Sequence, residues 1–190
     1  LEFEKTIADF VGSKHAIGVN SGTSGLHLLI KAFGVGREDE VITTPFSFIA
    51  STNCFLFEGA KPVFVDIDEK TFDISADMAE EKITDRTKLL LPVDVFGQPT
   101  NVKSFMDIAR KHGLKVLEDS CEAIGGEYEG AKTGSLADAA VFAFYPNKQI
   151  TTAEGGVIVT NDDSIAETCR SLRSQGRAET GRWLHHDQMG

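Results

Sequence analysis

Short apolar runs alternate with longer amphipathic stretches along most of this chain. The short runs are rich in Val, Ile and Phe and predict β-strands at 16–19, 40–43, 62–66, 88–93, 115–118, 139–144 and 157–160. The longer stretches repeat apolar residues at helical spacing and predict α-helices at 2–11, 24–33, 48–58, 77–83, 102–112 and 164–173. Such alternation is typical of a three-layer α/β/α sandwich around a mostly parallel sheet. Because only a loop separates the last two strands, we expect the sheet to be mixed.

The composition of the chain says little more about the fold but excludes several kinds of partner. At 190 residues, 41% of them hydrophobic and 25% charged, the chain fits one globular domain. The formal net charge of −10 argues against nucleic acid as a partner. The sequence has no long apolar span and no basic-then-apolar leader, so we expect a cytoplasmic protein that has no membrane partner. Its three cysteines form no CxxC pair, which favours buried thiols over disulfides or a zinc site.

Both ends of the chain look cut, so we expect residues 1–190 to be one domain that is incomplete at each end. Leu1 begins inside an amphipathic helix, and the segment 177–190 has the composition of a surface loop. His185, His186 and Asp187 in that segment look like metal ligands. Because neighbouring His side chains diverge, we expect a polar turn there and no metal site.

A segment rich in small residues, NSGTSG at 20–25, follows the first predicted strand and leads directly into a helix. Small residues let the backbone approach a ligand, and a helix N-terminus offers free N–H groups and a positive dipole to a phosphate. The plain alternative is an ordinary helix N-cap. The segment has no P-loop lysine and does not match GxGxxG.

Three single residues also follow predicted strands. Asp119 can cap the next helix, or it can lie under a bound ring and keep a pyridine nitrogen protonated. Lys148 is either an ordinary solvated lysine or, in a partly desolvated pocket near a cationic ring, a nucleophile with a lowered pKa. Phe48 can stack on a flat cofactor or pack in the core. Since ligands of parallel α/β sheets bind beyond the carboxyl ends of the strands, these elements together favour pyridoxal phosphate (PLP).

In this order, the motifs resemble those of the DegT/DnrJ/EryC1/StrS family of PLP-dependent nucleotide-sugar aminotransferases. The resemblance covers essentially the whole chain. Its most specific segments are NSGTSGL at 20–26, TPFSF at 44–48, GAKPVFVD at 59–66, EDSCEA at 118–123, FYPNK at 144–148 and EGG at 154–156. The resemblance implies the large PLP-binding domain of the fold-type-I enzymes, working as a homodimer. Members of the family also carry a smaller C-terminal domain, which we expect to be absent from 1–190, so this fragment alone should be poorly active.

The resemblance also implies roles for individual residues. Lys148 would form the Schiff base with the cofactor and shuttle protons. Asp119 would pair with the pyridine nitrogen and stabilise the carbanion. Gly22 and Thr23 would bind the cofactor phosphate, and Phe48 would stack on the ring. Glutamate would donate the amino group, and a nucleotide-linked keto-deoxysugar of polysaccharide or O-antigen biosynthesis would accept it.

Three positions depart from the family pattern. Glu122, which would face the ring hydroxyl or the substrate, stands where Gln or His is usual. Ala143 replaces a phosphate-binding Ser, and Asp94 stands where many members have His. None of the three removes the core machinery, but each affects which substrate we expect.

Two other classes of protein compete with the enzyme. A non-catalytic regulatory or scaffold relative could keep the fold, although it has no physical need to keep Lys148, Asp119 and the 20–25 segment together. A dinucleotide-binding oxidoreductase would need a different glycine spacing from that of Gly18, Gly22 and Gly25.

Overall fold

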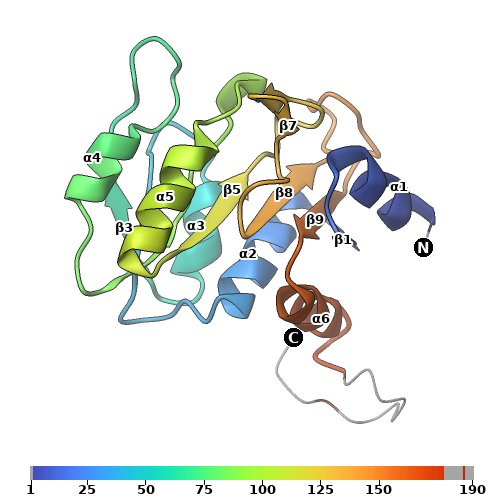
Figure 1. The fold of residues 1–190 in the computed structure, drawn as a ribbon. Helices are drawn as coiled ribbons and strands as arrows, with labels where there is room; N and C mark the ends of the chain where they lie inside the picture. Colours follow the sequence, from blue (N-terminus) through green and yellow to red (C-terminus); the bar gives the residue numbers. More distant parts are fainter. Residues whose placement is uncertain (1, 178–185, 187–190) are drawn as a thin grey trace.

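A seven-stranded mixed sheet forms the centre of the computed structural model, which describes residues 2–177 and 186 (Figure 1). The strand order is β1-β9-β8-β5-β4-β2-β3. β9 runs antiparallel to both β1 and β8, and every other pairing in the sheet is parallel. The strands are β1 (His15–Val19), β2 (Glu40–Thr43), β3 (Lys61–Phe64), β4 (Thr87–Leu90), β5 (Lys115–Asp119), β8 (Ala139–Ala143) and β9 (Gly156–Thr160).

Helices cover both faces of the sheet. The core on one face is formed by α2, α3 and α6, and the core on the other face by α4, α5 and α1. Figure 1 shows α4 and α5 together on one side of the sheet. The helices are α1 (Glu2–Val11), α2 (Gly22–Ala32), α3 (Ala50–Leu56), α4 (Ala76–Glu81), α5 (Val102–His112) and α6 (Asp163–Arg173). The predicted three-layer α/β/α sandwich is therefore confirmed.

Local sequence signals set where several helices begin and end. The Ser21 hydroxyl caps α2 by accepting a hydrogen bond from the Ser24 N–H, and Asp162 caps α6 in the same way. α5 ends at Gly113, which has φ of 69°, a left-handed conformation that glycine adopts without strain. The apolar faces of these helices then bury large side chains such as Phe55 and Phe105 against the sheet.

All thirteen predicted helices and strands are present, with shifted ends. The helix predicted from residue 48 begins at Ala50, so Phe48 lies in the loop before α3. Two strands of two residues each, β6 (Glu127–Tyr128) and β7 (Ala131–Lys132), form a hairpin that was not predicted, because such short strands show no alternation. A short 3₁₀ turn, η1 (Val95–Gly97), was also missed.

The predicted loop and metal-like cluster near the C-terminus lie, except for residues 177 and 186, outside the described residues. Among the described residues, no helix is long and apolar enough to cross a membrane. In the same residues, no group of three or more His, Cys, Asp or Glu side chains is arranged to hold a metal ion.

The direction of the strands matters most for function. Because β9 is antiparallel to both of its neighbours, β1 points the same way as the parallel strands from β8 to β3. The segments that follow β1, β2, β4, β5 and β8 therefore emerge at one edge of the sheet, as does the start of β9. We call this the carboxyl edge.

Candidate functional site

A cavity of about 850 Å³ opens at the carboxyl edge. The residues that line it lie in the segments that follow five strands of the sheet, β1, β2, β4, β5 and β8. These segments come together only in the folded chain. The cavity brings together all of the residues singled out from the sequence as cofactor-binding: Gly22, Thr23, Phe48, Asp119, Glu122 and Lys148. The expectation that these motifs meet at one edge is confirmed.

Lys148 and Glu122 form an ion pair inside this cavity. The Lys148 Nζ donates to Glu122 Oε1 at 2.8 Å, and the lysine side chain is only 13% exposed. Burial pushes the pKa of Glu122 upward, but the hydrogen bond and charge of Lys148, helped by the Phe96 N–H, outweigh it and hold that pKa below its ordinary value. The lowered pKa favours the ionised form of Glu122, and the hydrogen bond to this carboxylate holds the amine of Lys148 in place.

Glu122 is held by more than its lysine. Its Oε2 accepts from the Phe96 N–H at 3.1 Å, and its backbone carbonyl accepts from the side chain of Gln149. Phe96 has φ of 55°, a left-handed backbone that is unusual for a bulky residue. This conformation directs the Phe96 N–H into the cavity. The next residue, Gly97, has no room for a side chain, since a Cβ there would lie 3.0 Å from the Glu122 carbonyl oxygen.

Asp119 lies at the end of β5 and is almost completely buried. Its Oδ2 accepts from the Ser51 hydroxyl at 2.6 Å, and its Oδ1 accepts from the Cys121 N–H at 3.3 Å. The Ser51 hydroxyl is in turn 2.6 Å from the Ser47 hydroxyl. The sequence analysis missed both serines, because Ser47 lies in the loop before α3 and meets Ser51 in the first turn of that helix only once the loop has folded.

The start of α2 packs closely against Ala143, Cys121 and Gly156 because Gly22 has no side chain. A Cβ on Gly22 would lie 2.8 Å from both the Ala143 Cβ and the Cys121 Sγ. On the other side, a Cβ on Gly156 would lie 2.8 Å from the Gly22 nitrogen. Ser21 satisfies the Ser24 N–H, so the first-turn N–H groups of Gly22 and Thr23 are those available to a ligand. Ala143, one of the three positions that depart from the family pattern, therefore lies directly against Gly22.

A second group of acids lies behind Asp119, and none of them forms an ion pair with a residue that the structure describes. Asp94 is completely buried, with Oδ2 accepting from the Ser120 hydroxyl at 2.7 Å and Oδ1 from the Thr100 N–H at 2.8 Å. Burial raises the pKa of Asp94 to about 6, although these hydrogen bonds oppose the rise. Glu118 shares a hydrogen bond with Asp94, and burial together with the Asp94 charge raises the pKa of Glu118 well above its usual value. Both acids therefore have raised pKa values, with burial as the largest cause.

Asp73 extends this acidic group from the loop after β3. Burial, and then the charge of Asp94, raise the pKa of Asp73 to about 7. Within the described residues its Oδ1 has no hydrogen-bond partner. No sequence pattern pointed to this side chain, because it approaches Asp94 only through the folding of a loop.

The cysteines are free, as the sequence suggested. Burial raises the pKa of each thiol, and the charge of Asp119 adds to the effect at Cys54 and Cys121. The thiols therefore stay protonated near neutral pH and are poor nucleophiles. This leaves Lys148 as the nucleophilic side chain to consider among the residues named at the cavity.

Comparison with solved structures defines the class of protein. The fold is that of the large domain of the fold-type-I aminotransferases, and S. venezuelae DesV superimposes with a TM-score of 0.94 at 36% identity, covering 100% of this chain and 50% of DesV. The chain belongs to the DegT/DnrJ/EryC1/StrS aminotransferase family, whose model matches residues 1–190. This is a family of PLP-dependent sugar aminotransferases, so the resemblance inferred from the motifs is confirmed.

Two curated relatives illustrate what the chain is similar to. GDP-perosamine synthase of Caulobacter vibrioides is 49% identical over 176 residues, which are 93% of this chain and 47% of the relative. A pleiotropic regulatory protein of Geobacillus stearothermophilus is 42% identical over 186 residues, 97% of this chain and 50% of that protein. The chain thus spans about half the length of the curated relatives it matches.

Proposed function

We propose that the protein uses PLP in the carboxyl-edge cavity to move an amino group from glutamate to the keto carbon of a nucleotide-linked deoxysugar. The observation that carries this proposal is the convergence of Lys148, Asp119 and the start of α2 in one cavity. The name of the Caulobacter relative, a synthase of a GDP-linked sugar, supports a sugar nucleotide as the acceptor.

The residues of the cavity suit a phosphorylated pyridine ring. An anion fits at the first turn of α2, where the N–H groups of Gly22 and Thr23 and the helix dipole favour negative charge. A buried carboxylate, Asp119, is suited to hold a protonated ring nitrogen. Phe48 lines the cavity and is 75% exposed, so its ring is free to cover a flat ligand. When bound, PLP supplies an electron sink for the carbon that exchanges the amino group.

Three side chains of this chain have separate roles in the proposed reaction. Lys148 supplies the primary amine that attaches the cofactor and, once released, carries the proton at the reacting carbon. Asp119, oriented by the Ser51 hydroxyl, keeps its charge fixed at the end of β5. Glu122 keeps the Lys148 ammonium at one place in the cavity while the lysine is free. Each role needs only atoms that the fold already holds in position.

Borohydride trapping in the whole protein tests the attachment site. The protein is mixed with PLP, reduced and digested, and the modified lysine is located by mass spectrometry. We expect a single pyridoxyl label on Lys148 that is absent in Lys148→Ala and unchanged in Lys103→Ala, an exposed lysine of α5. Labels scattered over surface lysines, with none on Lys148, would overturn the proposed attachment.

Turnover tests the reaction itself. With glutamate and a keto-deoxysugar nucleotide, we expect 2-oxoglutarate and an amino sugar nucleotide in equal amounts. Lys148→Ala should lower the rate by at least about a thousandfold, because it removes both the attachment point and the acid–base group. Labelling of Lys148 without transfer to any keto sugar nucleotide would leave the cofactor but refute the acceptor.

A regulatory role is the second candidate function, because the Geobacillus relative is named a pleiotropic regulatory protein. The intact constellation of Lys148, Glu122 and Asp119 supports the enzyme instead. The two functions separate in Lys148→Ala. A purely regulatory protein would keep its biological effect in that variant, whereas an enzyme would lose it together with turnover.

A further inference from the structure

Three phenylalanine rings meet at the rim of the cavity, on the side away from α2. The ring of Phe46 stacks on that of Phe72 with centroids 5.9 Å apart, and it meets the ring of Phe96 edge-on at 6.0 Å. All three are exposed, Phe96 most of all at 77%. Phe46 and Phe96 also line the cavity. We call these three residues the aromatic rim.

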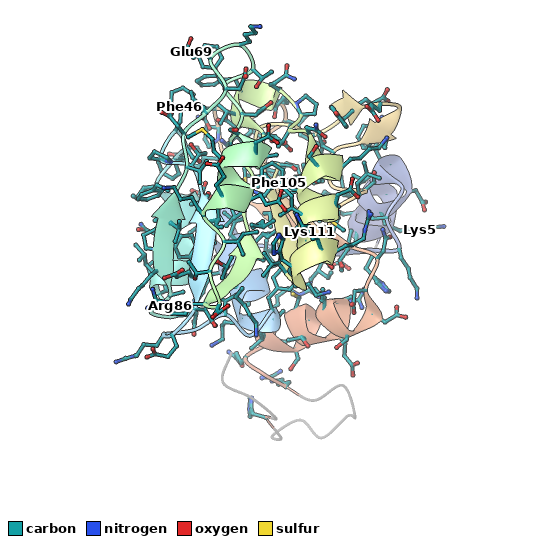
Figure 2. The ribbon with its side chains drawn as sticks, turned by 60° about the vertical axis from the view of Figure 1, so that its left-hand side comes forward. Lys5, Phe46, Glu69, Arg86, Phe105 and Lys111 are labelled. Atoms are coloured by element: carbon teal, nitrogen blue, oxygen red, sulfur yellow. The ribbon has the colours of Figure 1, made fainter. Side chains whose placement is uncertain are left out.

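The aromatic rim is assembled by the order of the strands. Its members follow β2, β3 and β4, which are neighbours in the sheet in the order β4-β2-β3. Figure 2 shows Phe46 just below the loop that carries Glu69, at the end of the molecule where these strands finish. Lys148 and Asp119 follow β8 and β5, and the phosphate-suited turn follows β1. Along the carboxyl edge, the rim therefore lies at the opposite end from that turn.

Two members of the rim have a strained backbone. Phe72 has φ of 63° and Phe96 has φ of 55°, so two of its three members are in the left-handed region. That conformation is costly for residues with bulky side chains and persists where the surroundings compensate for it. At Phe96 the same backbone sends the N–H inward to Glu122 while the ring stays at the rim. One residue thus links the reactive pair to the aromatic surface.

The rim begins beside the reactive pair, where the Phe96 N–H contacts Glu122, and extends away from it to Phe72. Phe72 follows β3, which lies three strand spacings, about 15 Å, from β5, so this end of the rim suits the far end of a long, two-ended substrate. A sugar joined through a diphosphate to a nucleoside has a length of this order. Exposed aromatic rings bind planar bases by stacking, and such stacking tolerates different bases. If the sugar is at Lys148, the far end of the molecule can reach the rim.

Resting on the proposed function, we infer that the aromatic rim of Phe46, Phe72 and Phe96 binds the nucleobase of the sugar nucleotide by stacking. Phe96 and Phe72 supply the exposed faces, and Phe46 braces both of them. The start of α2 is then left to the cofactor phosphate, and the substrate enters from the opposite end of the cavity.

Calorimetric titration of the PLP-loaded whole protein tests this site, with GDP, UDP, dTDP and base-free pyrophosphate as probes. The key variant is Phe72→Leu/Phe96→Leu, which keeps apolar bulk and a side chain without β-branching but removes the rings. Phe96→Tyr keeps a ring. Phe10→Leu, an exposed phenylalanine of α1 that lines no part of the cavity, is the control.

We expect at least one nucleoside diphosphate to bind more tightly than pyrophosphate. The double variant should weaken that binding by at least about fivefold, in line with the usual contribution of one stacked base. Phe72→Leu alone, which changes no residue that contacts Glu122 or Lys148, should raise KM for the sugar nucleotide while leaving kcat and labelling of Lys148 nearly unchanged. Phe96→Tyr and Phe10→Leu should bind as the wild type does, and pyrophosphate binding should not change in any variant.

Other results overturn the inference. Nucleoside diphosphates that bind no better than pyrophosphate would mean that the base is not recognised. Unchanged nucleotide binding in the double variant, with a changed oligomeric mass by light scattering, would mean that a second copy of the chain covers the rim. Failure of Lys148 to label, with nucleotide binding still lost in the double variant, would refute the proposed chemistry and leave the base site standing.

Discussion

Two pairs of ionisable side chains lie on either side of Asp119, and they are accommodated in different ways. On the closed side, Asp94 and Glu118 are buried, and their hydrogen-bond donors are neutral: the Ser120 hydroxyl and the Thr100 and Gly134 N–H groups. On the cavity side, Glu122 is partly exposed and faces the ammonium of Lys148. Burial without a cation raises the pKa of the first two acids, and the lysine lowers the pKa of Glu122.

The difference separates a structural pair from a reactive one. The acids of the closed pair are satisfied by the protein itself, and their hydrogen bonds connect the segments after β4 and β5. On the proposed function, the cavity pair holds the amine to which the cofactor would attach, and Glu122 would then contact the ligand. Asp119 sits between them with its charge unshared by any lysine or arginine in the contacts that the structure describes. Two substitutions, Asp119→Asn and Ser120→Ala, and the pH dependence of stability test this division.

Asp119→Asn is expected to have the largest effect. The amide keeps the shape and an acceptor for Ser51 but removes the charge that faces the cavity. We expect amino transfer to fall by at least about a hundredfold, the usual loss when one preorganised electrostatic partner is removed, while Lys148 still labels. Glu118→Gln on the closed side is the matched control, because it also replaces a buried carboxyl group by an amide of the same shape. Equal losses of amino transfer in the two variants would mean that the closed side and the cavity side do not differ in function.

Ser120→Ala should have an intermediate effect, confined to stability. It removes the hydroxyl that donates to Asp94 Oδ2 and leaves a buried acceptor without that partner. We expect a cost of about 1–3 kcal/mol in the free energy of unfolding, measured by urea denaturation, and a further rise in the pKa of Asp94. Labelling of Lys148 should not change. A loss of labelling with intact stability would mean that the closed pair takes part in cofactor binding.

The pH dependence of stability should show the smallest effect, with opposite signs for the two pairs. Asp94, Glu118 and Asp73 have raised pKa values, so the folded state holds more protons than the unfolded state and stability falls as pH rises from about 4 to 7. Glu122 has a lowered pKa, so its contribution is present above about pH 4.5 and is lost as pH falls through the lowered value.

Melting temperatures between pH 3.5 and 8 separate these contributions. Asp94→Asn should reduce the fall in melting temperature toward neutral pH by a few degrees. Glu122→Gln should reduce the fall in melting temperature toward acid pH by a smaller amount. Glu167→Gln, an exposed residue of α6, is the control. If Glu122→Gln altered the neutral side instead, its carboxylate would not be paired with Lys148 in solution.

Much of the fold could be predicted because its signals are local. Helical spacing and short apolar runs reflect which face of each element is buried, so all six helices and all seven strands of the main sheet were found. Phe48 shows the limit, since the pattern around it predicted a helix that begins two residues later. The β6–β7 hairpin shows another, because two-residue strands have no period to detect.

The sequence by itself determined the chemistry that the site contains, because a lysine, an aspartate and a small-residue turn each follow a strand directly. Only the tertiary structure decided which groups act together. Glu122 and Lys148 are 26 residues apart in the sequence and meet only in the folded chain. Asp94 follows β4 and contacts Glu118 on the neighbouring strand β5. Phe46, Phe72 and Phe96 meet because the sheet order is β4-β2-β3. The order of the strands sets these pairings, and it depends on the packing of the whole core rather than on any local pattern.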